Sequence, residues 1–157
     1  GEAKVGELHV AIHADQHVLA LQVAVHVAAL VHVREGERYH QLRDKGYRLG
    51  IVTRNCRAAV LTMFPDMDEY VDCLHARDDV VHLNPDPRHL RDNIDALGAE
   101  AALSVVVGDG ALDMQAGQAL GMRCVGVLTG SNDTHALTDA GATEVLADYR
   151  GLVSLLT

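Results

Sequence analysis

Residues 103–113 read Leu-Ser-Val-Val-Val-Gly-Asp-Gly-Ala-Leu-Asp. The apolar run at the start predicts a buried β-strand, and the Gly-Asp-Gly that follows predicts a tight turn. Asp109 therefore stands at the carboxyl end of a strand, where open α/β sheets bind their ligands. Asp113 follows four residues later. Carboxylates in such a place are costly without a positive partner, so we expect a hard cation such as Mg²⁺ there.

Strands alternate with helices on both sides of this stretch. Further strands are expected at 47–52, 70–75, 123–128 and 144–147, and helices at 53–64, 87–97, 112–120, 134–140 and 149–156. Asp86 and Pro87 form a helix start, and Gly98 forms a stop. This alternation predicts a three-layer α/β fold with a parallel, doubly wound sheet, in one domain over residues 1–157 whose core is 47–157.

The first 46 residues give a less regular pattern. Residues 8–15 alternate like a strand, residues 17–33 fit either a helix or a hairpin, and residues 37–45 read as a helix stopped by Gly46. Residues 18–33 are apolar enough to contact a second copy of the chain, so a homodimer is expected.

Composition limits the classes of partner. The 157 residues include 13 basic and 22 acidic ones, for a net charge of −9, and 48 % are apolar. The negative charge argues against nucleic acid and against an anionic membrane surface. Three cysteines without CxxC spacing indicate buried thiols in a reducing compartment. We expect a cytoplasmic protein.

Three blocks of sequence, taken together, resemble the haloacid dehalogenase-like (HAD) phosphohydrolase superfamily. The blocks are Leu49-Gly50-Ile51-Val52-Thr53-Arg54-Asn55, the segment 82–90 around Asn84-Pro85-Asp86-Pro87, and Val107-Gly108-Asp109-Gly110-Ala111-Leu112-Asp113 with the following strand. They are similar to the second, third and fourth motifs of that superfamily, in the same order. The resemblance implies a Rossmann-like core and a Mg²⁺-dependent site for a small phosphorylated molecule. The segment before Thr53 is too short for a full cap domain of this superfamily, so residues 1–46 are expected to be the first strand with a cap remnant or a dimer contact.

The residues themselves suggest how such a site would work. The Thr53 hydroxyl and the amides of Arg54 and Asn55 stand where a helix begins, which suits a phosphate oxygen; the alternative is that Thr53 only caps the helix. Asn84 completes the expected phosphate-binding set. Asp109 is the best candidate for a metal ligand, or else an N-cap. Asp113 would hold a metal-bound water or cap an amide.

Two departures from the superfamily pattern concern catalysis. Its nucleophile belongs to an Asp-x-Asp segment in the first strand, and no such segment precedes Thr53. The nearest match is 12–18, in which either His13 takes the nucleophile position and Asp15 the acid–base position, or Asp15 is the nucleophile and His17 moves the proton. In both cases Asp15 is also expected at the metal.

The second departure is the missing third-motif lysine. Both lysines of the chain, Lys4 and Lys45, precede Thr53, and Asn84 stands at the lysine's place. A neutral amide does not offset the charge of carboxylates and phosphate oxygens; Arg54 or Arg88 would have to do so. We therefore expect a pseudoenzyme that binds phosphate and metal with weakened or lost phosphatase activity. The alternative is an active Mg²⁺-dependent phosphate-ester hydrolase with a non-standard first motif.

Overall fold

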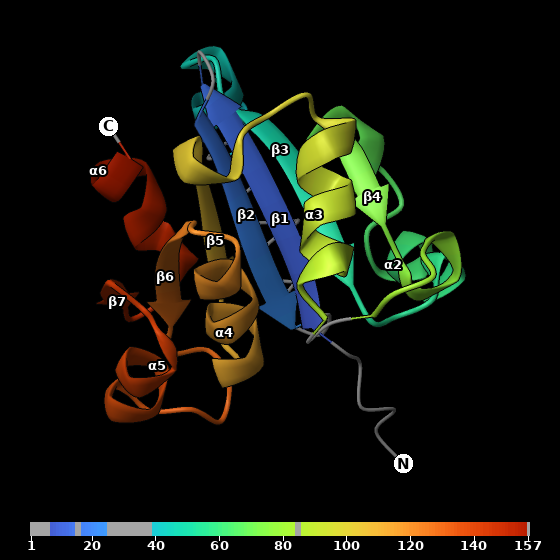
Figure 1. Ribbon diagram of the computed structural model, residues 1–157. Coiled ribbons are helices and arrows are strands. Elements are labelled where there is room, and N and C mark those ends of the chain that lie inside the picture. Colours follow the sequence, from blue (N-terminus) through green and yellow to red (C-terminus); the bar gives the residue numbers. More distant parts are fainter. Residues whose placement is uncertain (1–6, 15–16, 25–38, 84–85, 157) are drawn as a thin grey trace.

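A seven-stranded sheet runs through the centre of the computed structural model, which describes residues 7–14, 17–24, 39–83 and 86–156 (Figure 1). The order of its strands is β4-β3-β1-β2-β5-β6-β7. The strands are β1 (Glu7–Ala14), β2 (His17–Ala24), β3 (Arg48–Thr53), β4 (Cys73–His75), β5 (Ser104–Gly108), β6 (Arg123–Val127) and β7 (Glu144–Leu146). The predicted α/β architecture is confirmed.

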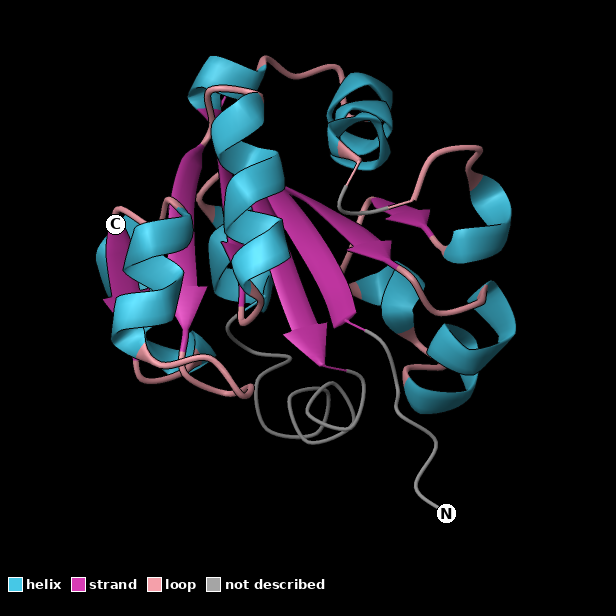
Figure 2. Cartoon of the chain, turned by 60° about the horizontal axis from the view of Figure 1, so that its bottom comes forward, coloured by secondary structure: helices cyan, strands magenta, loops and turns pink. Residues whose placement is uncertain are grey.

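Helices cover both faces of the sheet (Figure 2). The helices are α2 (Arg57–Met63), α3 (Pro87–Ala96), α4 (Ala111–Ala119), α5 (Thr134–Ala140) and α6 (Leu152–Leu156), and residues 39–44 are also helical. One face packs against residues of α3, α4 and α5, such as Ile94, Met114 and Leu137. The other packs against 39–44, α2 and α6, through Leu42, Val60 and Leu152. The result is the predicted three-layer arrangement.

Local sequence signals explain where α3 begins and ends. The Asp86 carboxylate accepts a hydrogen bond from the Arg88 amide as N-cap, and Pro87 fills the first helical position. Gly98 lies just beyond the last turn at φ +66°, a conformation that favours glycine. Leu90, Ile94 and Leu97 are buried on one side of the helix, as their spacing predicts.

The first two strands form an antiparallel hairpin whose first strand opposes the rest of the sheet. β1 pairs antiparallel with both β2 and β3, whereas β2 pairs parallel with β5. β1 is therefore an exception to the expected parallel sheet. The six other strands keep their carboxyl ends at one edge, toward which the arrowheads of β2 and β6 point at the bottom of Figure 1.

Short 3₁₀ turns link several of these elements. They are η1 (Met67–Glu69), η2 (Arg77–Asp79), η3 (Ala101–Leu103) and η4 (Tyr149–Gly151). The predicted strand at 70–75 is shorter than expected, because η1 precedes it and pairing with β3 involves only Cys73, Leu74 and His75. Among the described residues, no helix has the length and apolar character needed to span a bilayer.

Candidate functional site

The carboxyl edge of the sheet brings two of the predicted residues to the same side of the molecule. Thr53 is the last residue of β3, and Asp109 directly follows β5. Both are buried, with 0 % and 3 % of their surface exposed. β1 and β2 lie between these strands, so three strand separations of about 4.8 Å place ~14 Å between the two backbones.

Asp109 is enclosed by the loop that follows β6. The Thr129 hydroxyl lies 3.4 Å from Asp109 Oδ2, and the Asn132 side-chain amide donates to the Asp109 carbonyl at 3.1 Å. Gly130 is so close that a Cβ there would be 2.8 Å from Asp109 Cγ. The alternative role expected for Asp109 was the N-cap of the following helix. The N-cap of α4 is Gly110 instead.

Asp113 has a structural task at the start of α4. Its Oδ2 accepts a hydrogen bond from the Gly110 amide at 3.1 Å, and its side chain is buried. An acidic group in the first turn also favours the helix through the helix dipole. The structure thus shows the capping contact that was one of its two expected roles.

Thr53 forms a tight turn with the residues that follow it. Its Oγ1 accepts from the Asn55 amide at 3.1 Å and lies 3.3 Å from Asn55 Nδ2. The N-cap of α2 is Cys56, so Thr53 is not the helix cap. Arg54 is exposed in the same turn. Thr53, Arg54 and Asn55 therefore lie together at the carboxyl edge, while Asn84 lies outside the described residues.

The cations near the third-motif segment are engaged in ion pairs. Arg88 pairs with Asp86, Nη2 to Oδ2 at 2.6 Å, and its hydrogen bonds lower the pKa of Asp86 to about 2. With 62 % of its side chain exposed, Arg88 is held at the surface. This geometry does not support the expectation that Arg88 replaces the missing lysine.

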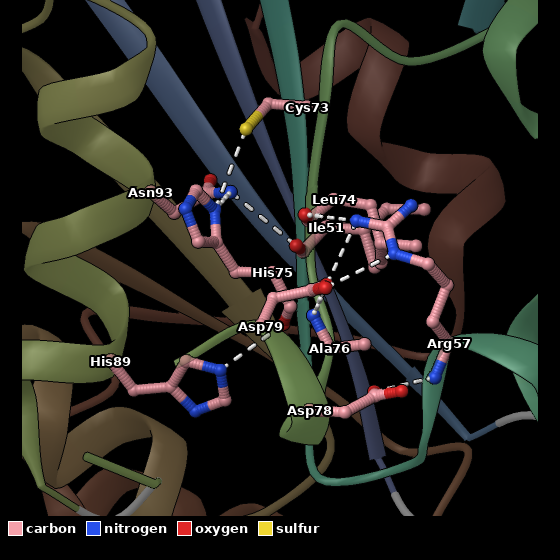
Figure 3. A network of polar contacts seen from close by, with 10 residues as sticks. All are labelled: Ile51, Arg57, Cys73, Leu74, His75, Ala76, Asp78, Asp79, His89 and Asn93. Carbon is pink, nitrogen blue, oxygen red and sulfur yellow. Dashed lines mark hydrogen bonds and ion pairs between the residues drawn. The ribbon is translucent and has the colours of Figure 1, made fainter. Parts of the chain in front are cut away.

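Arg57 is held on the other side of β4 (Figure 3). Its guanidinium donates to Asp79 at 2.8 and 3.1 Å and to the Leu74 carbonyl at 3.2 Å, and its amide donates to Asp78 at 2.8 Å. Burial raises the pKa of Asp79, but hydrogen bonds from Arg57 and the Ala76 amide outweigh burial and lower it. Arg57 thus fixes the turn after β4 rather than a ligand.

A polar layer that the sequence analysis missed joins α3 to β3 and β4 (Figure 3). Asn93 is fully buried, and its Nδ2 lies 2.8 Å from His75 Nδ1 and 3.3 Å from the Ile51 carbonyl. Cys73 Sγ lies 3.4 Å from His75 Nδ1, and buried His89 contacts the His75 carbonyl through Nε2 at 3.1 Å. Burial lowers the pKa of His75, so its neutral form accepts from Asn93.

The strand pairing separates His13 from the carboxyl edge. His13 is opposite Val18, and Val18 is opposite Ser104, the first residue of β5. Asp109 follows the other end of that strand, so His13 is not beside it; the expectation failed because β1 runs antiparallel. Asp15 lies outside the described residues and its role stays a prediction. The carboxylate residue that β1 does bring to this edge is Glu7, next to Leu8, which pairs with Thr53.

The donor set at the start of α4 suits a hard cation. Asp109 and Asp113 offer carboxylate oxygens, which Mg²⁺ prefers, and it usually retains several waters beside one or two carboxylates. Within the described ranges, no three His, Cys, Asp or Glu residues are grouped around a common point. Asp109 and Asp113 are the described residues at the start of α4 that could hold such a cation.

Comparison with known proteins establishes the family. The sequence profile described as haloacid dehalogenase-like hydrolase matches residues 15–127. The chain belongs to this family. The matched region includes the end of β3, with Thr53, and the β5–α4 segment, with Asp109.

Relatives in the family include phosphatases. The chain is 33 % identical over 118 residues to a plasmid-borne phosphoglycolate phosphatase of Cupriavidus necator, covering 74 % of this chain and 51 % of that protein. It is 33 % identical over 93 residues to the pyrophosphatase PpaX of Bacillus cereus, covering 58 % and 43 %. The crystal structure of a HAD phosphatase from Thermococcus onnurineus superimposes with a TM-score of 0.65 at 30 % identity, covering 75 % and 54 %. The chain spans about half the length of the curated relatives it matches.

Proposed function

We propose that this chain binds a small phosphorylated molecule together with Mg²⁺, at a phosphohydrolase-type site with weakened turnover. The observation that carries the proposal concerns two residues at the same edge of the sheet. Thr53 is the last residue of β3 and Asp109 directly follows β5, and both side chains are buried and hydrogen bonded. The phosphatases among the relatives support a phosphate ligand.

In this proposal each half of the site has one task. Thr53 and Asn55 bind phosphate oxygens through hydroxyl and amide donors, with Asn84 as a further expected donor. Asp109 binds Mg²⁺ directly, and Asp113 orients a metal-bound water. Mg²⁺ when bound offsets the charge of the phosphate oxygens. A hydrogen-bonded, largely buried Asp109 is preorganised for this task, so little side-chain freedom is lost on binding.

Two observations on described residues support weakened turnover. The register puts His13 at the opposite edge from Asp109, and Arg88 is paired with Asp86 at the surface. Among the described residues, neither His13 nor Arg88 supplies the nucleophile or the cation that phosphoryl transfer uses.

Thermal unfolding with Mg²⁺ and inorganic phosphate tests binding. We expect the two ions together to raise Tm more than either alone, because each completes the other's site. Asp109→Asn should abolish the Mg²⁺ response, and Thr53→Val should weaken the phosphate response. Asp139→Asn is the matched control, since this exposed carboxylate pairs with His135 on α5. A wild-type Tm that neither ion moves would refute the proposal.

Turnover of an aryl phosphate with Mg²⁺ tests the catalytic half. We expect little hydrolysis, and no further decrease in Asp15→Asn. Robust turnover that Asp15→Asn abolishes would instead establish the active hydrolase with Asp15 in the chemistry. Turnover lost in Glu7→Gln but retained in Asp15→Asn would assign the carboxylate to Glu7, which opens β1 at the carboxyl edge. Either result would refute weakened catalysis.

A further inference from the structure

Asn93 on α3 carries a buried oxygen atom without a hydrogen-bond partner among the described residues. The side chain is fully buried, and its Oδ1 packs against β3, where a Cβ on Gly50 would lie 2.1 Å from it. Its amide nitrogen, in contrast, contacts two groups, the Ile51 carbonyl at 3.3 Å and His75 Nδ1 at 2.8 Å (Figure 3). A buried acceptor that stays unused is costly, so its presence needs an explanation.

The two contacts of this nitrogen fix the position of the proton on His75. The Ile51 carbonyl only accepts hydrogen bonds, so the Asn93 amide must turn its NH₂ group toward it. The same NH₂ group then faces His75 Nδ1, which has to accept and therefore carries no proton. The contacts thus require a neutral His75 with its proton on Nε2.

Protonation of His75 reverses these requirements. Both ring nitrogens of an imidazolium donate, so Nδ1–H would point at the Asn93 NH₂ group across 2.8 Å. Half a turn about the Asn93 Cβ–Cγ bond brings Oδ1 to Nδ1 and restores a hydrogen bond. The same turn takes the NH₂ group away from the Ile51 carbonyl and points it at the Gly50 Cα, which offers no acceptor. The oxygen that is unused beside neutral His75 is thus the acceptor that charged His75 requires.

We propose that Asn93 and His75 form a proton switch between α3 and the sheet. Uptake of a proton from water at His75 Nδ1 turns the Asn93 amide, breaks its hydrogen bond to Ile51 and loosens α3 from β3. One rotation affects two strands, because Ile51 belongs to β3 and His75 to β4. His89 keeps its contact with the His75 carbonyl at 3.1 Å, since its Nε2 can donate in either state of His75.

The groups around His75 leave the transition to its imidazole. Among the described residues, the titratable and charged groups that face it are Cys73 on β4, Arg57 on α2, Asp79 in η2, and His89 and Asp92 on α3. Burial has the largest influence and lowers the pKa of His75, Asp92 and Asp79 raise it, and Arg57 lowers it. Burial raises the pKa of Cys73, whose Sγ lies 3.4 Å from His75 Nδ1, so this thiol stays protonated throughout. The switch therefore operates as the pH falls below the ~6.5 of an unfolded histidine.

A consequence for the candidate site rests on the proposed function. Ile51 lies two residues before Thr53 on β3, so loss of the contact at Ile51 would disturb the phosphate-binding turn. Sulfate keeps its charge between pH 5 and 8 and serves as the probe. We expect sulfate to raise the Tm of the wild type less at pH 5.5 than at pH 7.5, and equally at both pH values in His75→Gln.

The decisive measurement is an NMR titration of the ¹⁵N-labelled full chain from pH 8 to pH 5. It follows the ring nitrogens of His75, the side-chain NH₂ group of Asn93, and hydrogen exchange of the α3 amides corrected for the intrinsic effect of pH. We expect the Asn93 signals to shift with the same apparent pKa as the His75 ring. The protection of the α3 amides should fall about tenfold over the same transition, the equivalent of one buried hydrogen bond.

Two variants attribute the transition to His75. Glutamine accepts from the Asn93 NH₂ group but does not titrate, so His75→Gln should make the Asn93 signals and the α3 protection independent of pH. His135→Gln is the matched control, because this exposed histidine pairs with Asp139 on α5 and its loss should leave the transition unchanged.

The wild-type titration decides the switch even if His75→Gln does not fold. Asn93 signals and α3 protection that stay constant while His75 titrates would overturn it, and so would a His75 that stays neutral down to pH 5. The NMR transition without any effect of sulfate on Tm would support the switch and count against the proposed function alone.

Discussion

The carboxyl ends of β5 and β3 are built in different ways, although both belong to the same edge of one sheet. At β5, the loop after β6 surrounds Asp109 with a hydroxyl, an amide and a glycine, and the carboxylate is nearly inaccessible. At β3, the Thr53 hydroxyl accepts a hydrogen bond from the Asn55 amide in the turn that follows the strand. The charged side chains nearby form ion pairs, Arg57 with Asp79 and Arg88 with Asp86.

This difference indicates which half of the site is organised to bind a ligand. The contacts described for Asp109 come from neutral groups, the Thr129 hydroxyl and the Asn132 amide, at the end of a strand where open α/β sheets bind their ligands. An ion pair between two exposed side chains adds modest stability to the fold, and its charges offset each other, so little net charge is left to attract a ligand. We therefore expect the β5 side to govern binding and the β3 side to govern stability.

The largest effect is expected on the β3 side, at Gly50. A Cβ there would lie 2.1 Å from Asn93 Oδ1 and 2.9 Å from Leu97 Cδ1, so α3 has to move away from the sheet. We expect Gly50→Ala to lower the free energy of unfolding by about 3 kcal/mol. Urea denaturation followed by circular dichroism measures it.

Gly121→Ala serves as the reference for this variant. Its Cβ would meet no atom within 4 Å, but the residue has φ +73°. The cost should therefore come from backbone strain alone, about 1 kcal/mol. If Gly50→Ala were no more costly than Gly121→Ala, the close packing of Asn93 against β3 would be disproved.

On the β5 side, Gly130→Ala should act on binding more than on stability. The added Cβ would lie 2.8 Å from both Cγ and Oδ2 of Asp109, atoms of a side chain that can rotate. We expect a loss of stability of ~1 kcal/mol and a Tm response to Mg²⁺ much smaller than in wild type. Retention of the full Mg²⁺ response would mean that the loop does not position Asp109.

The sequence predicted the β5 side better than the β3 side, for physical reasons. Asp109 and its strand follow from a local pattern, an apolar run ending in Gly-Asp-Gly, because strand and turn preferences act over a few residues. The His89–Asn93 layer was missed, although both residues flank the apolar stripe of Leu90 and Ile94 at helical spacing. The four-residue spacing of His89 and Asn93 beside this stripe was the signal that could have predicted a buried polar pair.

Other features had no local signal. Alternation of apolar and polar residues over 8–15 predicts a strand but not its direction. A repeat of two residues is the same whether the strand runs parallel or antiparallel to its neighbours. The antiparallel course of β1, and with it the position of His13, depends on pairing with β2 and β3.

A smaller effect is expected from pH on the β3 side. Burial lowers the pKa of His75 below the usual 6.5, although Asp92 and Asp79 oppose this. The unfolded chain then binds a proton more readily than the folded one, so stability is full above about pH 6.5 and falls as the pH decreases toward the folded pKa. His75→Gln should flatten this part of the profile, measured by urea denaturation from pH 5 to 8. Parallel profiles for the two proteins would contradict a buried neutral His75.

The smallest effect is a difference in reactivity between thiols on the two sides. Burial raises the pKa of Cys124, on β6, to about 11, which leaves about a thousandth of it as thiolate at pH 8. Burial also raises the pKa of Cys73, on β4, which is only half-buried. Iodoacetamide should therefore label Cys73 slowly and Cys124 only after unfolding, as peptide mass spectrometry would show in buffer and in urea. Equal rates in buffer would mean that the β5–β6 core opens as readily as the β3–β4 edge, and the preorganisation assigned to Asp109 could not hold.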